Sequence, residues 1–586
     1  MTVESTSIKT KVITLKIDGV EIKTTSGKRI LEAALDNDIY IPNLCSLRDV
    51  KLAFGACRLC QVQIEGREGF VTACSEPAVE GMVVHSNTPE VNAMRRKILQ
   101  MMLARHAFIC LECHRRERCE PGGTCLRLMS VNEQFCILCP NNGRCEVQRA
   151  SDFIGLGKMP YPYTSKGYPI ERENPFIVRN NNLCILCGRC IRVDQEILGI
   201  EAIAFNRRGK DTCIGGAFGR PLLESGCTFC GCCVEVCPTG ALMDVGDEWQ
   251  RWPDPKRAMI RCMYACPAGV DVPRFIRFIR EHKYNEALAV IQEKVPFAHI
   301  CSRICSRPCE IACRRSKLDQ GLAIRALERF AAERASVKWT LEGKEPASGK
   351  KVAVISSGPA GLTAAYYLAK KGGHSVTVFE SEPQAGGMLR TAIPGYDLPR
   401  QLLDDELEML KKLGVEIKTQ AKVDSMGRLF QDGFQAVFVA LDTRKIAEFG
   451  ITVNPDGLST GRKGLFAIGE EVTGKHIFIK GVAVGRKAAI SIDSYLGGSG
   501  NIDETLAPVD KGVPRIGRMP NFAQRKRVTM PTASEEQGKG KFAKVELGFS
   551  DEAGAEEALR CMGCDLRFMV AKMVAQPPPS AAKAKS

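Results

Sequence analysis

The chain has 586 residues, of which 44% are hydrophobic and 25% are charged, and its formal net charge is +15. This length predicts several domains, and the absence of a run of about 18 apolar residues argues against a membrane span. The start, MTVESTSIKTKV, lacks the apolar segment of a secretory signal, so we expect a cytoplasmic protein. The basic stretch 517–527 accompanies no nucleic-acid motif, so we interpret it as solvated and expect no nucleic-acid partner.

Twenty-eight cysteines fall in tight C-x2-C and C-x3-C groups along the chain. Without an export signal, thiolate ligation of metal in a reducing compartment is favoured over disulfides. Zinc is the alternative, because C-x2-C pairs also build zinc sites. Runs of three or four cysteines at ferredoxin spacing favour iron–sulfur clusters instead.

The first domain is predicted over residues 1–95. Residues 12–24 alternate apolar and polar side chains around an Asp-Gly turn, which predicts a β-hairpin, and residues 27–39 have helical spacing. Four cysteines follow with the spacing C-x11-C-x2-C-x13-C, namely Cys45, Cys57, Cys60 and Cys74. This combination resembles a plant-type β-grasp ferredoxin with one [2Fe–2S] cluster. It is most similar to the start of the large iron–sulfur subunit of NADH:quinone oxidoreductase, a module also found in cytosolic iron hydrogenases and NAD-linked formate dehydrogenases.

Residues 96–154 are predicted to hold further clusters. The pattern H-x3-C-x2-C-x5-C comprises His106, Cys110, Cys113 and Cys119. In the same family this pattern holds a [4Fe–4S] cluster with one imidazole ligand. The spacing C-x2-C-x5-C then recurs, with a cysteine in place of the histidine, in Cys125, Cys136, Cys139 and Cys145. We interpret it as an additional all-cysteine [4Fe–4S] site, and the alternative is that the two half-motifs compete for one cluster.

Residues 175–250 contain the paired motif of a bacterial two-cluster ferredoxin. The first run is Cys184, Cys187 and Cys190, and the second is Cys227, Cys230, Cys233 and Cys237, followed by proline. Because the last cysteine of each run serves the other cluster, Cys237 completes the first cluster. Asp194 stands where the first run should have its fourth cysteine. Three outcomes are open: Asp194 ligates iron, a [3Fe–4S] cluster forms, or a spare thiolate from Cys232 or Cys213 substitutes.

Residues 255–345 are similar to the helical iron–sulfur module of the glutamate synthase small subunit and related NADPH:ferredoxin oxidoreductases. That resemblance implies two [4Fe–4S] clusters and eight ligands, of which this stretch supplies Cys262, Cys266, Cys301, Cys305, Cys309 and Cys313. The segment EEALRCMGCD resembles the start of that module but lies near the C-terminus. We infer that the tail, residues 499–586, returns to the module and contributes Cys561 and Cys564.

Residues 346–498 are predicted to form a Rossmann-like domain for FAD. A strand, the turn SSGPAGL, a helix and a second strand ending in Glu380 give the dinucleotide fingerprint, in which a helix N-terminus receives the pyrophosphate. The candidate cofactor-binding residues are Ser357, Gly358, Pro359, Ala360, Gly361, Glu380, Gly386, Gly387, Gly469 and Glu470. Two departures from the family are Ser356 in place of the first glycine and Glu470 in the closing Gly-Asp pair. The relatives' second nucleotide fold, for NADPH, has no counterpart of sufficient length here.

The motifs use all but two of the 28 cysteines and imply one [2Fe–2S] cluster, up to six [4Fe–4S] clusters and FAD. No catalytic residues are predicted, and no hydrogenase, molybdopterin or NADH-binding motif is present. We therefore expect an electron-transfer subunit of an NAD(P)-linked hydrogenase or formate dehydrogenase, a group that includes electron-bifurcating complexes with ferredoxin. The expected partners are an NADH-binding flavin subunit and the catalytic subunits. The alternatives are a non-catalytic scaffold with an empty FAD domain and a stand-alone NADPH oxidoreductase.

Overall fold

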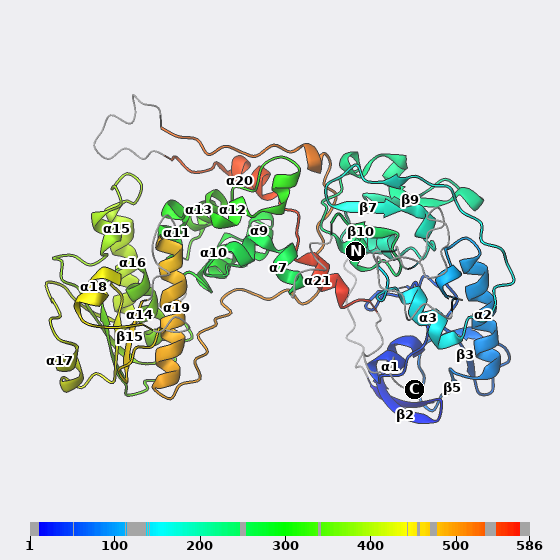
Figure 1. The fold of residues 1–586 in the computed structure, drawn as a ribbon, viewed down its shortest axis with the longest axis horizontal. Coiled ribbons are helices and arrows are strands. Elements are labelled where there is room, and N and C mark those ends of the chain that lie inside the picture. The colour runs from blue at the N-terminus through cyan, green and yellow to red at the C-terminus, as the bar shows by residue number, and fades with distance from the viewer. Residues whose placement is uncertain are drawn as a thin grey trace, which may run out of the picture. The chain divides into compact units, whose positions relative to one another are not determined.

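The computed structural model describes residues 11–50, 52–111, 113, 136, 139, 141–246, 254–337, 342–441, 443–453, 458–468, 477–533 and 546–574. The chain divides into two compact units. The first unit comprises residues 1–251, 511–524 and 563–586, and the second comprises residues 252–510 and 525–562. Figure 1 labels their elements. No helix in the described ranges has both the length and the apolar character that a membrane crossing requires.

The first unit begins with a five-stranded mixed sheet of order β2-β1-β5-β3-β4. Its strands are β1 (Val12–Ile17), β2 (Val20–Thr25), β3 (Gln61–Ile64), β4 (Val71–Thr72) and β5 (Val83–His85). The predicted hairpin is confirmed: β1 and β2 pair antiparallel around Asp18 and Gly19, both with positive φ as a tight hairpin turn needs. Helix α1 (Ile30–Asp36) is shorter than predicted. A capping box between Arg29 and Glu32 starts it, and the positive φ of Asp38 follows its end.

Two longer helices, α2 (Pro89–Leu103) and α3 (Glu146–Ile154), join this sheet to the ferredoxin part of the unit. There β10 (Leu242–Asp244), β7 (Ile177–Asn180) and β6 (Ile170–Glu171) form one sheet, and β8 (Ile203–Asn206) pairs with β9 (Cys213–Gly216). The short helices are α4 (Arg189–Arg192), which continues into the π-helical turn η5 (Val193–Ile197), and α5 (Cys232–Glu235). Near the C-terminus, α21 (Leu566–Ala571) packs on α5, and Arg567 bonds both Glu235 and Asp244.

The second unit begins with short helices packed around one apolar core. They are α7 (Pro255–Met259), α8 (Arg261–Ala265), α9 (Val272–Arg280), α10 (Tyr284–Gln292), α11 (Ala298–Ile304), α12 (Pro308–Ile311) and α13 (Ile324–Arg334). From the C-terminal region, α20 (Asp551–Ala558) packs on α9 and α13. Gly554 permits this contact, because a Cβ there would lie 2.4 Å from the Phe330 ring.

The rest of the second unit is a doubly wound domain. Its parallel sheet has the order β13-β12-β11-β14-β15, formed by β11 (Lys351–Ile355), β12 (Ser375–Phe379), β13 (Glu416–Lys418), β14 (Ala436–Val439) and β15 (Leu465–Ala467). The helices are α14 (Pro359–Lys370), α15 (Met388–Thr391), α16 (Arg400–Lys412), α17 (Met426–Gln431), α18 (Thr443–Glu448) and α19 (Ile477–Tyr495).

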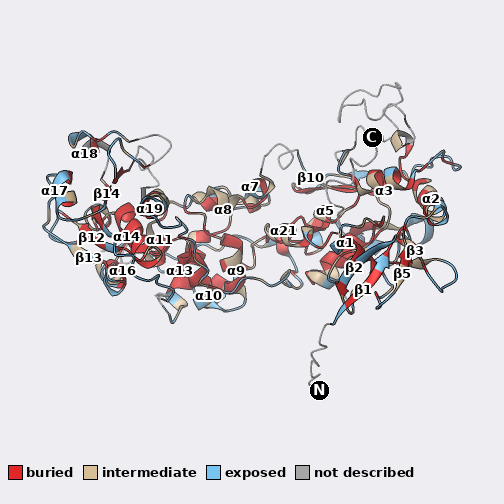
Figure 2. Cartoon of the chain, turned by 90° about the horizontal axis from the view of Figure 1, so that it is seen from below, coloured by how far each residue is buried: buried red, intermediate tan, exposed pale blue. Residues whose placement is uncertain are grey.

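Helix α14 is buried along its length, shown in red in Figure 2, and the long α19 lies alongside it. Gly485 allows the close contact, because a Cβ there would lie 2.5 Å from the Ala360 carbonyl oxygen. Between β14 and β15 the described residues include α18 but no further sheet strand. The described part therefore contains one Rossmann-like sheet.

Candidate iron–sulfur and nucleotide sites

The four cysteines of the first domain face one another. Cys45 is hydrogen-bonded to Cys57 and Cys60 to Cys74, and all four are buried. The backbone N–H groups of Leu44 and Cys57 donate to Cys57 Sγ and Cys45 Sγ at 3.4 and 3.5 Å. The hydrogen bond with Cys57 lowers the pKa of Cys45 to about 6, against the opposing effect of burial. N–H donors aimed at sulfur favour the thiolate, which is the form that ligates iron.

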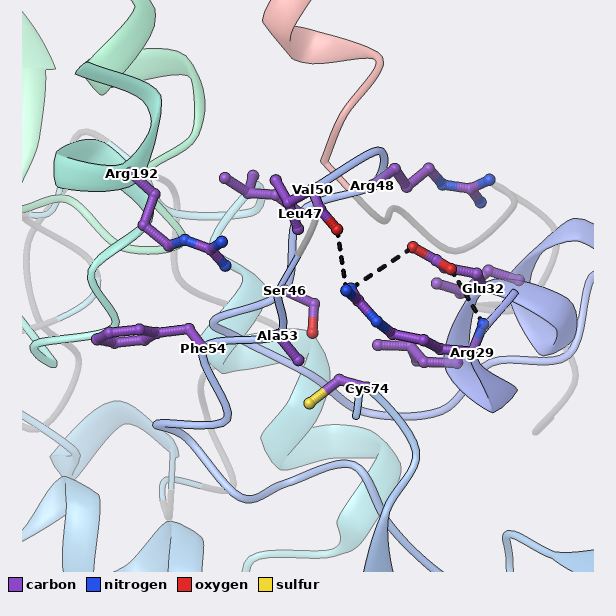
Figure 3. A pocket seen from close by; sticks show the side chains of 12 residues that line it. Arg29, Glu32, Ser46, Leu47, Arg48, Val50, Ala53, Phe54, Cys74 and Arg192 are labelled. Atoms are coloured by element: carbon purple, nitrogen blue, oxygen red, sulfur yellow. Dashed lines mark hydrogen bonds and ion pairs between the residues drawn. The ribbon is translucent and has the colours of Figure 1, made fainter. Parts of the chain in front are cut away.

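A pocket lies beside Cys74 (Figure 3). Its walls include Arg29, Ser46, Phe54 and Arg192. Arg29 Nη2 donates to the Val50 carbonyl at 2.9 Å, which fixes the guanidinium near the cysteine. The hydrogen bond with Cys60 and, more weakly, the Arg29 charge lower the pKa of Cys74. The Arg29 and Arg192 guanidiniums in the wall are accompanied by the Glu32 carboxylate, whose Oε1 lies 3.9 Å from Arg29 Nη1.

His106 is buried with one ring nitrogen unused. The imidazole is hydrogen-bonded to the Leu183 backbone, and Nδ1 has no hydrogen-bonding partner among the described residues. Burial, together with the Lys166 charge, lowers the pKa of His106 to about 4. A neutral imidazole oriented by a backbone carbonyl, with its second nitrogen free, is the arrangement of metal-ligating histidines. The residue therefore fits the predicted ligand role.

The structure brings together cysteines from both halves of the 96–154 segment. Cys110 is hydrogen-bonded to Cys136, and this bond, together with burial and the charges of Cys145 and Cys139, raises the pKa of Cys136. Cys145 Sγ donates to the Pro238 carbonyl at 3.6 Å, which ties this group to the ferredoxin part. Of the other predicted ligands, Cys113 is partly exposed, whereas Cys119 and Cys125 lie outside the described residues.

The two ferredoxin loops repeat the same backbone conformation. Leu186 and Gly188 have positive φ in the first loop, and Phe229 and Gly231 have positive φ in the second. In each loop the residue two after the first cysteine donates its N–H to that sulfur at 3.4 Å. Each loop then starts a short helix that contains the third cysteine of its run. The sequence repeat is therefore a structural repeat.

The first of these loops shares one cavity with the end of the second run. Cys184, Cys187, Cys190 and Cys237 line it, as the crossing rule predicts. Burial and the neighbouring thiolates, including Cys233 of the second group, raise the pKa of Cys190. The two groups of thiols are therefore adjacent.

Asp194 lies on η5 and faces the second group. A second cavity is lined by Asp194, Cys227, Cys230 and Cys233. The negative charge of Asp194 contributes a rise to the pKa of each of those three thiols. Burial raises the pKa of Asp194 to about 6, although the Ile203 N–H donates to its Oδ2 at 2.9 Å. Asp194 thus lines the second cavity as Cys237 lines the first.

The two spare thiols lie in different places. Cys232 also lines the second cavity, but its neighbours are Cys230, Cys233 and the Arg567 guanidinium. Cys213 lies on β9, and its charge contributes to the raised pKa of Cys184, a member of the first group. Cys213 is therefore a neighbour of the first group, although the sequence analysis considered it for the second.

In the second unit, four cysteines gather around a carboxyl group that the sequence analysis missed. Cys301 is hydrogen-bonded to Cys305, and Cys266 and Cys309 neighbour them. Glu328, on α13, is 6% exposed, and burial together with the charge of Cys305 raises its pKa. A charged residue within the apolar face of a predicted helix is the signal that could have identified it.

The returning C-terminal segment is anchored beside the loop that follows Cys313. Arg560 Nη2 donates to Asp319 Oδ2 and to the Gln320 carbonyl, both at 2.9 Å. Glu557 Oε1 accepts the Ala323 N–H at 2.7 Å. These bonds hold Cys561, the next residue after Arg560, against the helical module. Cys262 lies on α8, which contacts α12, and Cys564 follows Cys561 by three residues.

The nucleotide fingerprint forms a strand–turn–helix. Gly358 is the N-cap of α14, and a Cβ on Gly361 would lie 2.1 Å from the Ser356 carbonyl oxygen, so this position requires glycine. Glu380, directly after β12, accepts the Ser357 N–H at 3.0 Å. Burial alone would raise the pKa of Glu380, but the bonds from Ser357 and Glu382 lower it.

The remaining fingerprint residues complete one side of this turn. Ser357 Oγ accepts the Gly386 N–H at 2.8 Å, and a Cβ on Gly387 would lie 3.2 Å from the Gly358 nitrogen. Pro359 and Ala360 form the first turn of α14. Gly469 and Glu470 lie outside the described residues. The N-terminus of α14 at Gly358 is the place where this fingerprint receives a pyrophosphate.

Family models match four parts of the chain. Residues 10–89 match a 2Fe-2S iron–sulfur cluster binding domain, and residues 174–243 match the ferredoxin-like domain of NADH-quinone oxidoreductase subunit 3. Residues 255–339 match dihydropyrimidine dehydrogenase domain II, 4Fe-4S cluster, and residues 354–402 match an NAD(P)-binding Rossmann-like domain. These matches confirm one [2Fe–2S] domain, [4Fe–4S] domains and a Rossmann-like domain.

Among similar proteins, the beta subunit of the NADP(+)-dependent formate dehydrogenase of Moorella thermoacetica is 39% identical over 33% of this chain and 31% of its own length. The beta subunit of the NADPH-Fe(3+) oxidoreductase of Geobacter sulfurreducens is 32% identical over 41% of this chain and 35% of its own. A subunit of the NADP-reducing hydrogenase of Solidesulfovibrio fructosivorans is 29% identical over 41% of this chain and 37% of its own. The chain thus spans about a third of the length of these relatives. Its ferredoxin-like domain is similar to that of NADH-quinone oxidoreductase subunit 3, and parts of the chain are similar to subunits of these formate dehydrogenase, NADPH-Fe(3+) oxidoreductase and hydrogenase complexes.

Proposed function

We propose that this chain is the iron–sulfur and flavin electron-transfer subunit of a cytoplasmic NAD(P)-linked hydrogenase or formate dehydrogenase. The observation that carries the proposal is one continuous apolar core that includes Cys45, Cys57, Cys145 and Cys187, from three predicted cluster sites. Cys233 of the next group is adjacent to Cys190. Clusters held by such neighbouring thiols would pass single electrons through the unit. The residues supply position and charge, and the clusters supply the redox chemistry.

In the 96–154 segment we propose one shared cluster instead of two. The hydrogen bond between Cys110 and Cys136 supports this alternative, because these thiols come from the two different half-motifs. His106, with its unpartnered Nδ1, remains a candidate ligand. The number of [4Fe–4S] clusters would then be lower than the six that the sequence allows.

For the second ferredoxin cluster we propose Asp194 as the fourth ligand. The support is that the Asp194 charge contributes a rise to the pKa of all three thiols, Cys227, Cys230 and Cys233, whereas Cys232 is hydrogen-bonded to Cys230 and lies beside the Arg567 guanidinium. A carboxylate oxygen binds iron less tightly than a thiolate does, so one iron would be labile. In the second unit, the proximity of Cys266, Cys301, Cys305 and Cys309 supports one ligand group. Cys262, Cys313 and Cys561 of the same unit would contribute to the other.

The Rossmann-like domain would hold FAD, which pairs or splits single electrons. Support comes from the Gly358 helix N-terminus, the Glu380 carboxylate and the single sheet in the described residues. The nicotinamide site would lie on an NADH-binding partner, and hydrogen or formate chemistry on a catalytic partner. Electron bifurcation with ferredoxin belongs to the same proposal.

A scaffold with an empty flavin domain is the second candidate, and one contact favours it. Ser356 Oγ accepts the Gly358 N–H at 3.3 Å, which uses a donor that a pyrophosphate would need. Anaerobic purification followed by iron, acid-labile sulfide and flavin analysis tests both candidates. Iron with sulfide and FAD supports the electron-transfer subunit, and iron with sulfide but no flavin supports the scaffold. Colourless protein without labile sulfide contradicts both.

A further inference from the structure

Arg189 is a fully buried cation between two predicted cluster sites. It lies on α4 between Cys187 and Cys190, and its side chain is 0% exposed. Its guanidinium interacts electrostatically with Cys187 of the first ferredoxin group and also with Cys45 and Cys57 of the [2Fe–2S] domain. The same apolar core encloses those three cysteines. One guanidinium therefore lies within electrostatic reach of two sites.

The partners of Arg189 come from the segments that carry the neighbouring cysteines. Nη1 donates to Glu146 Oε1 at 2.7 Å, and Glu146 directly follows Cys145. Nη2 donates to Asn43 Oδ1 at 3.5 Å, two residues before Cys45. Nε, in contrast, has no hydrogen-bonding partner among the described residues. A buried N–H without an acceptor is costly, so its position calls for an acceptor such as sulfur.

We propose that Arg189 is a positioning residue that raises the reduction potentials of both the [2Fe–2S] site and the Cys184–Cys190 [4Fe–4S] site. The inference rests on the proposed function, because it requires clusters at these thiols. Reduction adds one negative charge to a cluster, and a cation in a low-dielectric interior stabilises that charge more than it would in water. Arginine suits this role because its guanidinium stays protonated. A single cation shared by two sites shifts both potentials in the same direction.

Arg192 provides a matched control on the same helix. It is 5% exposed, and its Nη2 donates to the Leu52 carbonyl and to Glu196 Oε2, both at 2.7 Å. Arg192 therefore fastens α4 to the [2Fe–2S] domain through bonds to these oxygens. A substitution of Arg192 therefore removes the bond between α4 and the [2Fe–2S] domain but keeps the Arg189 charge.

The test uses the anaerobically purified full chain and redox titration followed by EPR, in which temperature dependence separates the two cluster types. In Arg189→Met, both potentials should move to more negative values at unchanged iron and sulfide content. Arg189→Lys should stay closer to the wild type, and Arg192→Met, whose guanidinium lines the pocket beside Cys74 alone, should not shift both potentials together. Unchanged potentials in Arg189→Met, or an equal shift in Arg192→Met, would overturn the proposal.

Glu146→Gln keeps the inference testable if Arg189→Met loses its clusters. This variant removes the negative partner and retains the guanidinium, so both potentials should rise. A fall, or no change, would contradict the proposed role. Wild-type protein without any cluster signal would instead refute the proposed function itself, which separates the two failures.

Discussion

Cys110 and Cys136 are hydrogen-bonded to each other, although 25 residues and a motif boundary separate them in the sequence. If both thiols hold one cluster, Cys110→Ala, Cys136→Ala and the double variant should each lose the same amount of iron. Iron and acid-labile sulfide per chain measure the loss, and Cys213→Ala serves as the control that retains both. A double variant that loses about twice as much as either single variant would show two separate clusters.

Gly240 offers a way to disturb this site without changing a ligand. A Cβ at residue 240 would lie 2.6 Å from Cys139 Sγ, and a ligated sulfur cannot move aside cheaply. Gly240→Ala should therefore reduce cluster content in the first unit. Gly512→Ala is the control, because nothing lies within 4 Å of a Cβ there. Equal iron content in the two variants would contradict the assignment of Cys139.

Asp194→Cys should make the second ferredoxin cluster resistant to air. In the wild type we expect loss of one iron and a [3Fe–4S] EPR signal after brief oxidation, because a carboxylate holds iron more weakly than a thiolate. The variant should not show that signal. Cys232→Ser should behave like the wild type. The hypothesis fails if Asp194→Cys leaves spectra and potentials unchanged, or if Cys232→Ser alone destroys the cluster.

The buried ion pair between Arg560 and Glu557 should be essential to the stability of the second unit. Both side chains are 0% exposed, and removing one partner of a buried pair costs about 3–5 kcal/mol. Arg560→Met should lower the urea midpoint under anaerobic conditions and release iron from the module. Lys411→Met, which breaks the exposed Lys411–Glu408 pair, should cost about 1 kcal/mol or less. Similar midpoints in the two variants would exclude an anchoring role.

Ser356→Gly should stabilise the Rossmann-like domain and strengthen FAD binding. Ser356 has a φ of 88°, a conformation that costs a non-glycine residue about 1 kcal/mol. The change also frees the Gly358 N–H. Ser357→Ala, which removes the hydroxyl that bridges Glu380 and Gly386, should have the opposite effect. Thermal unfolding and flavin fluorescence titration measure both, and weaker FAD binding in Ser356→Gly would contradict the prediction.

Local chemistry explains what could be predicted. The hairpin around Asp18 and Gly19 and the strand–turn–helix that contains Gly361 follow from short-range turn and packing rules. The helix predicted over 27–39 was too long, because its ends depend on a capping box and on one residue with positive φ. The cysteine runs could also be recognised in the sequence, because neighbouring ligands of one cluster need a fixed local spacing.

The sequence by itself determined the types of domain, the cysteines available as ligands and the dinucleotide turn, because each is encoded within a few tens of residues. Only the tertiary structure decided that Cys110 meets Cys136, that Asp194 rather than Cys213 faces the second group, and that Arg189 lies between two sites. Glu328 was missed for the same reason. These contacts join segments far apart in the chain, and burial in a shared core, which no local spacing encodes, brings them together.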